Sequence, residues 1–339
     1  MKRIFSYTVL FAAAVVIIPA IPMCLSGKAG SDSGEVSAIA TDELVEVPII
    51  DEAAAEDYYK VLDVSTGEII NVPEKDYIVG AVCAEMPATF ETEALKAQAV
   101  AAHTYAERQR LRELENPTPE LCGADFSNDT SKYQGYFTEN QAKQYYGENF
   151  DMNYSKIKTA ADEVSDYIIT YNDEPIISAF HSMSSGKTES AEKAWGSAVD
   201  YLVPVDSSFD TSAPKYLEEV RYSKDVLREK LTSSFNGINL GDDFTTWLSL
   251  GECSESGTVL SVNAGGLTIS GNDLRTALAL RSACFTIEYV GEEAVITTKG
   301  YGHGVGMSQY GANSMALDGS TWQEILQHYY SGCEITVES

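Results

Sequence analysis

Two predicted helices that meet at a proline-containing corner constrain the fold of this chain more than any other stretch. Residues 77–86 place apolar side chains at helical spacing, and Pro87 should end this helix because the residue before a proline is displaced from the α region. A second helix is predicted over residues 91–112, with glutamates in its first turn and arginines in its last turn, an order that suits the helix dipole. Small side chains such as Ala99 and Ala102 indicate that this second helix packs closely against another element.

Glu85 is the unusual residue of the corner, because it is an acid in the last turn of an otherwise apolar helix. Burial and the negative end of the helix dipole both disfavour its carboxylate form. A carboxyl group that stays protonated near neutral pH is what a general acid requires. Residue type and position alone, however, favour an ordinary structural role, in which Glu85 caps backbone groups or pairs with an arginine of the next helix.

The N-terminal segment predicts a membrane anchor followed by an acidic tether. Residues 1–3 include two basic side chains, and residues 4–25 carry no charge, a length that can cross a bilayer as one helix. The positive-inside rule would keep residues 1–3 in the cytoplasm and place the rest of a single-pass membrane protein outside the cell. A cleaved signal peptide is the alternative, but no small-residue cleavage site follows. Residues 26–57 are acidic and poor in aromatic side chains, which predicts a disordered, solvated tether.

Residues 58–339 are expected to form one extracytoplasmic domain. Strand-like segments and turn signals predict hairpins, and helices lie between them without regular βαβ alternation. The expected fold class is therefore α+β, with helices and antiparallel hairpins that form a groove, preceded by one transmembrane helix. The net charge of −28 excludes nucleic acid as an expected partner, because no basic patch offsets it. The predicted hairpins cover residues 59–72, 166–180, 258–270 and 284–298.

Two loops of small and polar residues are candidates for a ligand site. Residues 181–189 follow a predicted apolar strand, and residues 300–311 hold five glycines, which bring backbone close to a ligand or to another chain segment. Glycine at every second position differs from the G-x-G-x-x-G pattern of nucleotide sites. The segment 306–311 misses the G-x-S-x-G pattern of serine hydrolases by one residue, and the strand–turn–helix context of that pattern is absent.

The histidines and cysteines do not predict a metal site or a disulfide framework. The four histidines form no zinc-binding motif, and no C-x-x-C occurs. His103 and His328 are expected to be structural, whereas His181 and His303 end apolar strands and are better placed to line a cleft. We therefore expect no metal and no cofactor. The six cysteines leave disulfide pairing undecided.

Three motifs in this order resemble the stage II sporulation protein D family of endospore formers. They are Ala84-Glu85-Met86-Pro87 with the alanine-rich stretch after it, the loop from His181 to Glu189, and the glycine-rich stretch 302–312. The resemblance covers residues 58–337. It implies a membrane-anchored lytic transglycosylase that cleaves peptidoglycan glycan strands during engulfment in sporulation. The implied partners are an amidase, stage II sporulation protein P, and a membrane scaffold, stage II sporulation protein M.

The resemblance also implies roles for particular residues. The catalytic glutamate of the family falls at Glu85, which would protonate the glycosidic oxygen and then accept a proton from the muramic acid C6 hydroxyl, giving a 1,6-anhydro product. A single acid is sufficient for this chemistry, whereas glycoside hydrolysis ordinarily needs two. The two loops would bind the sugar, although a purely architectural role explains them equally well. The predicted substrate-binding residues are His181, Ser182, Ser184, Tyr201, His303, Ser308, Gln309 and Tyr310.

Two features of the family leave alternatives open. Related chains include amidase enhancers, so a non-catalytic partner of a cell-wall amidase that binds glycan is the second hypothesis, and a purely structural septal protein is the third. Some relatives carry a Cys/His zinc site in the loop that matches residues 118–135. That loop holds only Cys122 in this chain, so no structural zinc is expected there.

Overall fold

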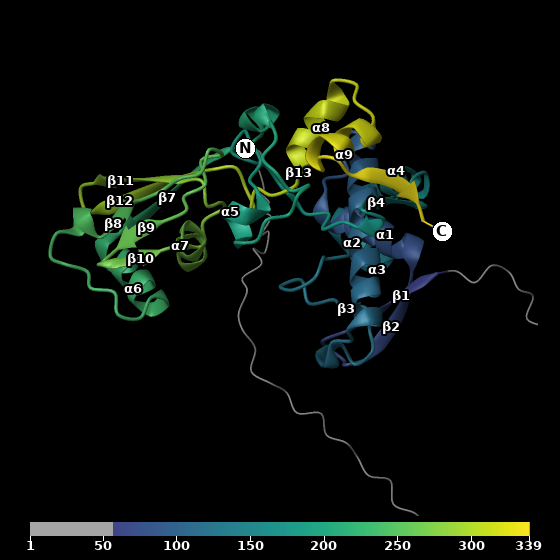
Figure 1. The fold of residues 1–339 in the computed structure, drawn as a ribbon, viewed down its shortest axis with the longest axis horizontal. Helices are drawn as coiled ribbons and strands as arrows, with labels where there is room; N and C mark the ends of the chain where they lie inside the picture. Colours follow the sequence, from purple (N-terminus) through teal and green to yellow (C-terminus); the bar gives the residue numbers. More distant parts are fainter. Residues whose placement is uncertain (1–56, 339) are drawn as a thin grey trace, which may run out of the picture.

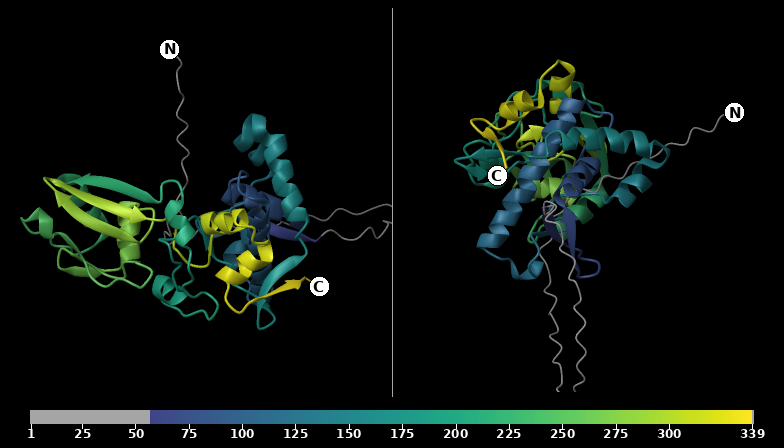
Figure 2. Two further views of the ribbon diagram at one scale, coloured as in Figure 1. Left: turned by 90° about the horizontal axis from the view of Figure 1, so that it is seen from above. Right: turned by 90° about the vertical axis from the view of Figure 1, so that its right-hand side faces the viewer.

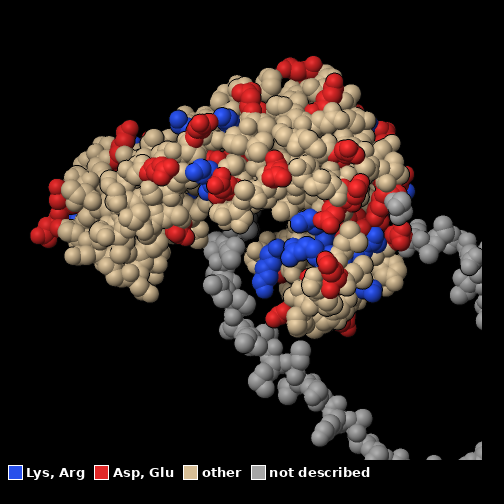
Figure 3. Space-filling model, viewed as in Figure 1, with Lys and Arg blue, Asp and Glu red and all other residues tan. Residues whose placement is uncertain are grey.

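The computed structural model describes residues 57–338, which form two packed units (Figures 1 and 2). The larger unit combines the first half of the described chain with its C-terminal segment, and the smaller unit consists of residues 217–299. Each unit has its own hydrophobic core of buried side chains. Figure 3 shows a surface that is hollowed between the two units, with Lys and Arg side chains gathered on the side of the larger unit.

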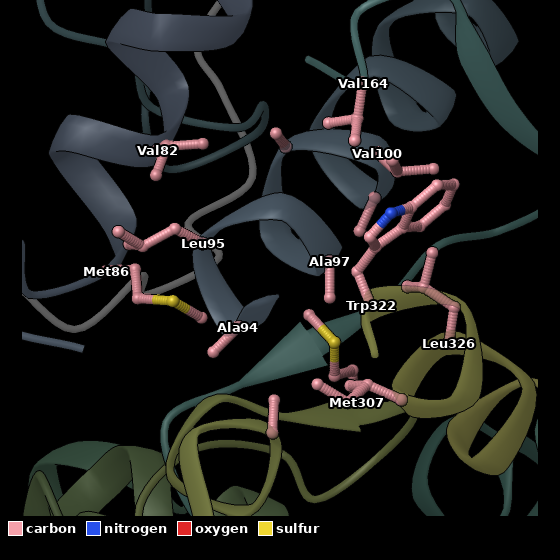
Figure 4. Packing of buried hydrophobic residues seen from close by; sticks show 14 of the residues in the cluster. Val82, Met86, Ala94, Leu95, Ala97, Val100, Val164, Met307, Trp322 and Leu326 are labelled. Atoms are coloured by element: carbon pink, nitrogen blue, oxygen red, sulfur yellow. The ribbon is translucent and has the colours of Figure 1, made fainter. Parts of the chain in front are cut away.

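Helix α2 is the centre of the larger unit. It runs over Thr92–Glu115, and its alanine-rich face is completely buried, as the small-residue spacing predicted. Small side chains let neighbouring backbones approach closely and still fill the interior at normal density. In Figure 4, Ala97 of α2 points toward Met307, and Leu95 lies beside Met86. The elements packed around α2 are α1 (Glu74–Glu85), α4 (Phe150–Asp162), β4 (Tyr167–Tyr171), α8 (Gln309–Leu317) and α9 (Trp322–Tyr329).

The corner between α1 and α2 confirms the prediction made from Pro87. Helix α1 ends at Glu85, and Met86 has an extended backbone with φ −123° and ψ 137°, the conformation that a following proline imposes. The side chains of Met86 and Phe90 are buried in the main core, so the turn is held on both sides of the proline. The structure therefore places Glu85 at the last position of a helix whose interior face is apolar.

The strands of the larger unit form three small sheets. The first hairpin is antiparallel, as expected, but β3 joins it in parallel, and a second short parallel pair links β6 to β13. These parallel pairs join segments far apart in the sequence and were not expected. The sheets consist of β1 (Tyr58–Leu62), β2 (Ile69–Pro73) and β3 (Phe126–Ser127), of β4, β5 (Glu174–Pro175) and β14 (Glu334–Val337), and of β6 (Phe180–His181) with β13 (Met307–Ser308).

The smaller unit is built from antiparallel strands and two helices. The hairpin predicted at residues 284–298 forms, and β7 pairs with its second strand to complete a three-stranded sheet. Trp247 is fully buried at the centre of this unit and packs edge-on against Phe244. The elements are β7 (Leu217–Ser223), α6 (Lys224–Ser234), β8 (Leu248–Leu250), β9 (Val262–Ala264), β10 (Leu267–Ile269), α7 (Gly271–Leu278), β11 (Phe285–Val290) and β12 (Glu293–Lys299). Two further helices lie outside this smaller unit. Helix α3 (Glu139–Tyr146) belongs to the larger unit, and helix α5 (Ala191–Trp195) lies in the segment after β6.

The expectation of a single-pass membrane protein requires correction. Within residues 57–338, no helix is both long enough and apolar enough to cross a membrane. The longest of the helices described above, α2, carries charged residues along its length, and its apolar face packs against protein. Among the described residues, the fold class is thus a mixture of helices and sheets without the expected transmembrane helix. The predicted anchor at residues 4–25 lies outside the described residues, as does the predicted tether except for its last residue.

Candidate functional site

Glu85 is a half-buried acid at the C-terminal end of α1. Burial raises the pKa of this carboxyl group to about 7, and a backbone hydrogen bond from Gly135 opposes the shift. The negative end of the helix dipole acts in the same direction as burial. A carboxyl group with these properties is protonated below neutral pH yet keeps contact with solvent, which is the state that proton donation to a ligand requires.

The structural alternative of a salt bridge at Glu85 does not occur. No ion pair among the described residues includes Glu85. Two arginines of α2 are engaged elsewhere, since Arg108 donates to the carbonyl of Pro175 and Arg110 pairs with Glu107. The backbone at the helix end is closed by the Met86 N–H, which donates to the Val82 carbonyl. The Glu85 side chain is therefore needed neither as an ion-pair partner nor as the cap.

The loop after β3 covers the Glu85 carboxyl group. A Cβ atom placed on Gly135 would lie 3.8 Å from Glu85 Oε1 and 3.3 Å from the Thr130 methyl group, so a glycine lets the loop backbone approach the acid. The neighbouring Gln134 is held by its backbone N–H, which donates to the Tyr105 hydroxyl at 3.2 Å. Both side-chain polar atoms of Gln134 are buried and have no hydrogen-bond partner among the described residues. Gln134 thus holds an unsatisfied buried amide one residue before Gly135, a group that a bound polar ligand would satisfy.

The two loops predicted to bind substrate do lie side by side. Strand β6 pairs in parallel with β13, so His181 and Ser182 lie next to the glycine-rich segment. The Ser182 carbonyl accepts hydrogen bonds from the Tyr310 N–H at 3.0 Å and from the Ser308 hydroxyl at 3.4 Å. This second segment also reaches the corner that carries Glu85, because Tyr310 packs edge-on against Phe90 with 5.0 Å between ring centroids.

A buried aspartate, Asp210, holds these loops together. It accepts hydrogen bonds from the Ser184 N–H and hydroxyl at 2.7 and 2.6 Å, from the Ser207 hydroxyl at 3.0 Å and from the Ser308 hydroxyl at 2.7 Å. Burial raises the pKa of Asp210, and these hydrogen bonds oppose that shift. Ser184 and Ser308 thus have their hydroxyl groups committed inside the protein, which corresponds to the architectural role that the sequence left open for them.

His181 is buried and His303 is half-buried, and their ring centroids are 5.7 Å apart. Burial lowers the pKa of His181 to about 4 and that of His303 to about 3, and each histidine is therefore neutral at physiological pH. His181 Nδ1 donates to the Val305 carbonyl at 3.1 Å, whereas its Nε2 atom is buried without a partner among the described residues. Trp195 packs on the His303 ring at a centroid distance of 5.5 Å.

The remaining predicted residues divide between the core and the loop junction. The Tyr201 hydroxyl accepts from the Ile177 N–H at 2.8 Å, and its ring packs against Tyr171 in the main core. Gln309 is buried and donates from Nε2 to Gln98 Oε1 of α2 at 3.2 Å. A cavity of about 390 Å³ lies at the far end of α2, beside Arg108 and Glu174, and none of the predicted site residues lines it.

The sequence did not predict Gln134, Gly135 or Asp210 as site residues. Gln134 and Gly135 lie in a polar loop whose approach to Glu85 is set by the tertiary fold. Asp210 lies among serine and threonine residues in a short 3-10 helix, Ser208–Ser212, a composition that is typical of any surface loop. The sequence feature that could have identified Gln134 is its position in an aromatic and polar loop, residues 122–136, which follows the alanine-rich helix.

The raised pKa of Glu85 predicts a specific dependence of stability on pH. The folded chain holds this proton more tightly than the unfolded chain, whose pKa is near 4.5. The free energy of unfolding should therefore fall as pH rises from about 4.5 to about 7. Each pKa unit corresponds to about 1.4 kcal/mol, which sets an upper limit of about 3 kcal/mol for this effect. Urea unfolding of wild type and Glu85→Gln at pH 5 and pH 8 should show the variant gaining stability relative to wild type at pH 8. Parallel pH profiles of the two proteins would contradict the raised pKa.

Fold and site together define a mixed α/β protein with one acid of raised pKa at a helix end. Two paired loops rich in serine, histidine and glycine reach the same corner through Tyr310. A family model described as Stage II sporulation protein matches residues 63–171. Stage II sporulation protein D of Bacillus subtilis (strain 168) is 38% identical over 266 residues, covering 78% of this chain and 75% of that protein. The protein of the same name from Bacillus amyloliquefaciens is 38% identical over 273 residues, covering 80% and 76%.

A more distant relative carries a different name. The amidase enhancer of Bacillus subtilis (strain 168) is 27% identical over 308 residues, which cover 76% of this chain and 40% of that protein. The identity to the two stage II proteins, over three quarters of their length, is sufficient to assign the family. The chain belongs to the stage II sporulation protein D family, a family of sporulation proteins.

Proposed function

We propose that this protein is a peptidoglycan lytic transglycosylase that cleaves the bond between N-acetylmuramic acid and N-acetylglucosamine, with Glu85 as the acid and then the base. The observation that carries the proposal is the half-buried carboxyl group of Glu85, whose pKa is raised to about 7 by burial and which pairs with no basic side chain of residues 57–338. The glycan substrate is what the resemblance to the stage II sporulation protein D family implies.

The proposed reaction needs one acid and no water. The Glu85 carboxyl group donates its proton to the glycosidic oxygen as the bond to the muramic acid C1 breaks. The resulting carboxylate takes the proton of the C6 hydroxyl, whose oxygen forms a new bond to C1. Glu85 returns to its protonated state, and the products are a 1,6-anhydro end and a free 4-hydroxyl end. General acid and base catalysis by one residue in two successive steps is favoured when its pKa lies near the working pH.

The test is the mass of the products formed by the purified full chain from glycan strands stripped of their peptides. Transglycosylation adds no atoms, so the masses of the fragments should sum to that of the parent strand and should include anhydro ends. Fragments that gain the mass of one water and carry reducing ends would assign a hydrolase instead. Intact strands after prolonged incubation would contradict both enzymatic readings.

The second candidate function is that of a glycan-binding enhancer of a cell-wall amidase. It is favoured by the relative that is named an amidase enhancer. The resemblance to the family predicts stage II sporulation protein P as the amidase and stage II sporulation protein M as a further partner. If enhancement is the main activity, adding this protein to that amidase on intact peptidoglycan should increase peptide release, and Glu85→Gln should enhance as strongly as wild type does.

A further inference from the structure

A second cluster of titratable side chains lies at the opposite end of α1 from Glu85. Glu74 is the first residue of α1, and Glu85 is the last, so about 16 Å of helix separates them. Around Glu74 lie His103 and Glu107 of α2 and Glu338, the residue after β14. One ligand atom from each of these four side chains falls within 4.8 Å of all the others. The cluster takes no part in the proposed reaction.

The His103 ring is oriented for ligation. Its Nδ1 atom lies 3.1 Å from the Tyr167 carbonyl, which can only accept, so Nδ1 carries the proton and the lone pair of neutral histidine is on Nε2. The side chain is completely buried. Nε2 lies 2.9 Å from Glu338 Oε2 and 3.3 Å from Glu74 Oε1. With the proton on Nδ1, Nε2 faces only acceptors, and no group of residues 57–338 donates a hydrogen bond to it. An unsatisfied nitrogen thus points into a group of carboxylates.

The surrounding contacts hold the carboxylates in place and leave a negative charge. Arg110 Nη2 lies 2.7 Å from Glu107 Oε2 and 3.2 Å from Glu338 Oε1, and the Tyr59 hydroxyl donates to Glu107 Oε1 at 2.7 Å. With all three carboxyl groups ionised and His103 neutral, the one guanidinium leaves two negative charges. One divalent cation would neutralise them. In metal sites, the histidine and carboxylate ligands are typically hydrogen-bonded to further protein groups that do not touch the ion.

We propose that Glu74, His103, Glu107 and Glu338 bind a divalent transition metal ion. Zinc is the ion with which the site is tested. One imidazole with carboxylates suits zinc better than calcium or magnesium, which prefer sites made of oxygen alone. The site joins the start of α1, the middle of α2 and the C-terminal end of the described chain, so the bound ion stabilises the folded state. The competing occupant is a proton on His103, because the carboxylates of Glu338 and Glu74 raise its pKa in spite of burial.

The test uses the full chain after treatment with EDTA and removal of the chelator. Calorimetric titration should show one zinc ion per chain, whereas magnesium should give no heat above the buffer. Saturating zinc should raise the midpoint of thermal unfolding by about 5 °C. The absorption edge of bound zinc should show only nitrogen and oxygen ligands at about 2.0–2.2 Å, because a sulfur ligand at about 2.3 Å would place the ion on cysteine thiolates and overturn the proposal.

Two variants make the result specific to this cluster. Glu338→Gln changes a partly exposed residue after the last strand, so the chain should still fold, and it should weaken zinc binding by about 10- to 100-fold. His103→Gln should lose the site. The matched control is His328→Gln, which changes a histidine that contacts the Asp206 carbonyl and no carboxylate, and its zinc affinity should equal that of wild type. Equal zinc affinity in all four proteins would place the ion at another site, and no zinc binding by wild type would leave a proton as the occupant of the cluster; either result would overturn the proposal.

Discussion

Replacing Glu85 by glutamine is expected to slow glycan strand cleavage by about 10²- to 10⁴-fold, the usual contribution of a general acid. Glutamine has nearly the same shape, but it can neither donate a proton to the glycosidic oxygen nor accept one from the C6 hydroxyl. The half-buried site and the Gly135 contact should be preserved, so glycan binding should change little. The measurement is the rate at which anhydro ends appear in strands of defined length.

The matched control for this variant is Glu91→Gln, which changes an exposed glutamate just before α2 in the same corner of the fold. Its rate should equal that of wild type. Thermal unfolding of both variants establishes that they are folded. A Glu85→Gln protein that cleaves within threefold of the wild-type rate would remove Glu85 from the mechanism and leave the amidase-enhancer function as the better hypothesis.

Replacing Gly306 by alanine is expected to destabilise the protein by about 3–5 kcal/mol. Gly306 has a φ of +72°, and an added Cβ atom would lie 2.0 Å from the Ala179 carbonyl oxygen. That oxygen accepts the hydrogen bond of the Met307 N–H at 3.0 Å, so the new atom would force β13 away from β6. The left-handed backbone costs about 1–2 kcal/mol for any side chain, and the overlap with backbone adds to it. Urea unfolding measures the loss.

A second variant, Gly304→Ala, separates the cost of the left-handed backbone from the cost of the overlap with Ala179. Gly304 has a similar φ of +80°, but a Cβ atom placed on it would meet nothing closer than the Glu189 Cβ at 3.5 Å, an ordinary contact. This variant should lose only the conformational part, about 1–2 kcal/mol. Equal losses in the two variants would show that the close approach of the glycine-rich segment to Ala179 does not contribute to stability.

Local patterns predicted the elements that carry the motifs. Apolar spacing and Pro87 located the end of α1 and hence Glu85 at a helix terminus, and the hairpins β1–β2 and β11–β12 form where alternation and turn residues indicated. These features depend on neighbours within a few residues. The predicted second strand of the hairpin at residues 166–180 is shorter than expected, because β5 ends at Pro175 and the chain then continues to β6, which pairs with β13 instead.

Partners that come from distant segments could not be predicted in the same way. Ser184 and Ser308 were predicted to bind sugar, but their hydroxyl groups donate to Asp210, which is 26 residues from one and 98 from the other. His103 was expected to be a satisfied core histidine, yet its Nε2 faces Glu338, which the chain brings back to α2 through β14. The separate core of residues 217–299 was likewise not anticipated.

The sequence by itself determined the family, the helix corner and the identity of the acid at its end, because motifs and helical periodicity are written in contiguous residues. The tertiary structure alone decided how far the Glu85 carboxyl group is desolvated, the commitment of the serines to Asp210 and the meeting of His103 with three glutamates. These properties depend on desolvation and on charges within a few ångströms. Such surroundings are supplied by segments that the sequence keeps tens to hundreds of residues apart.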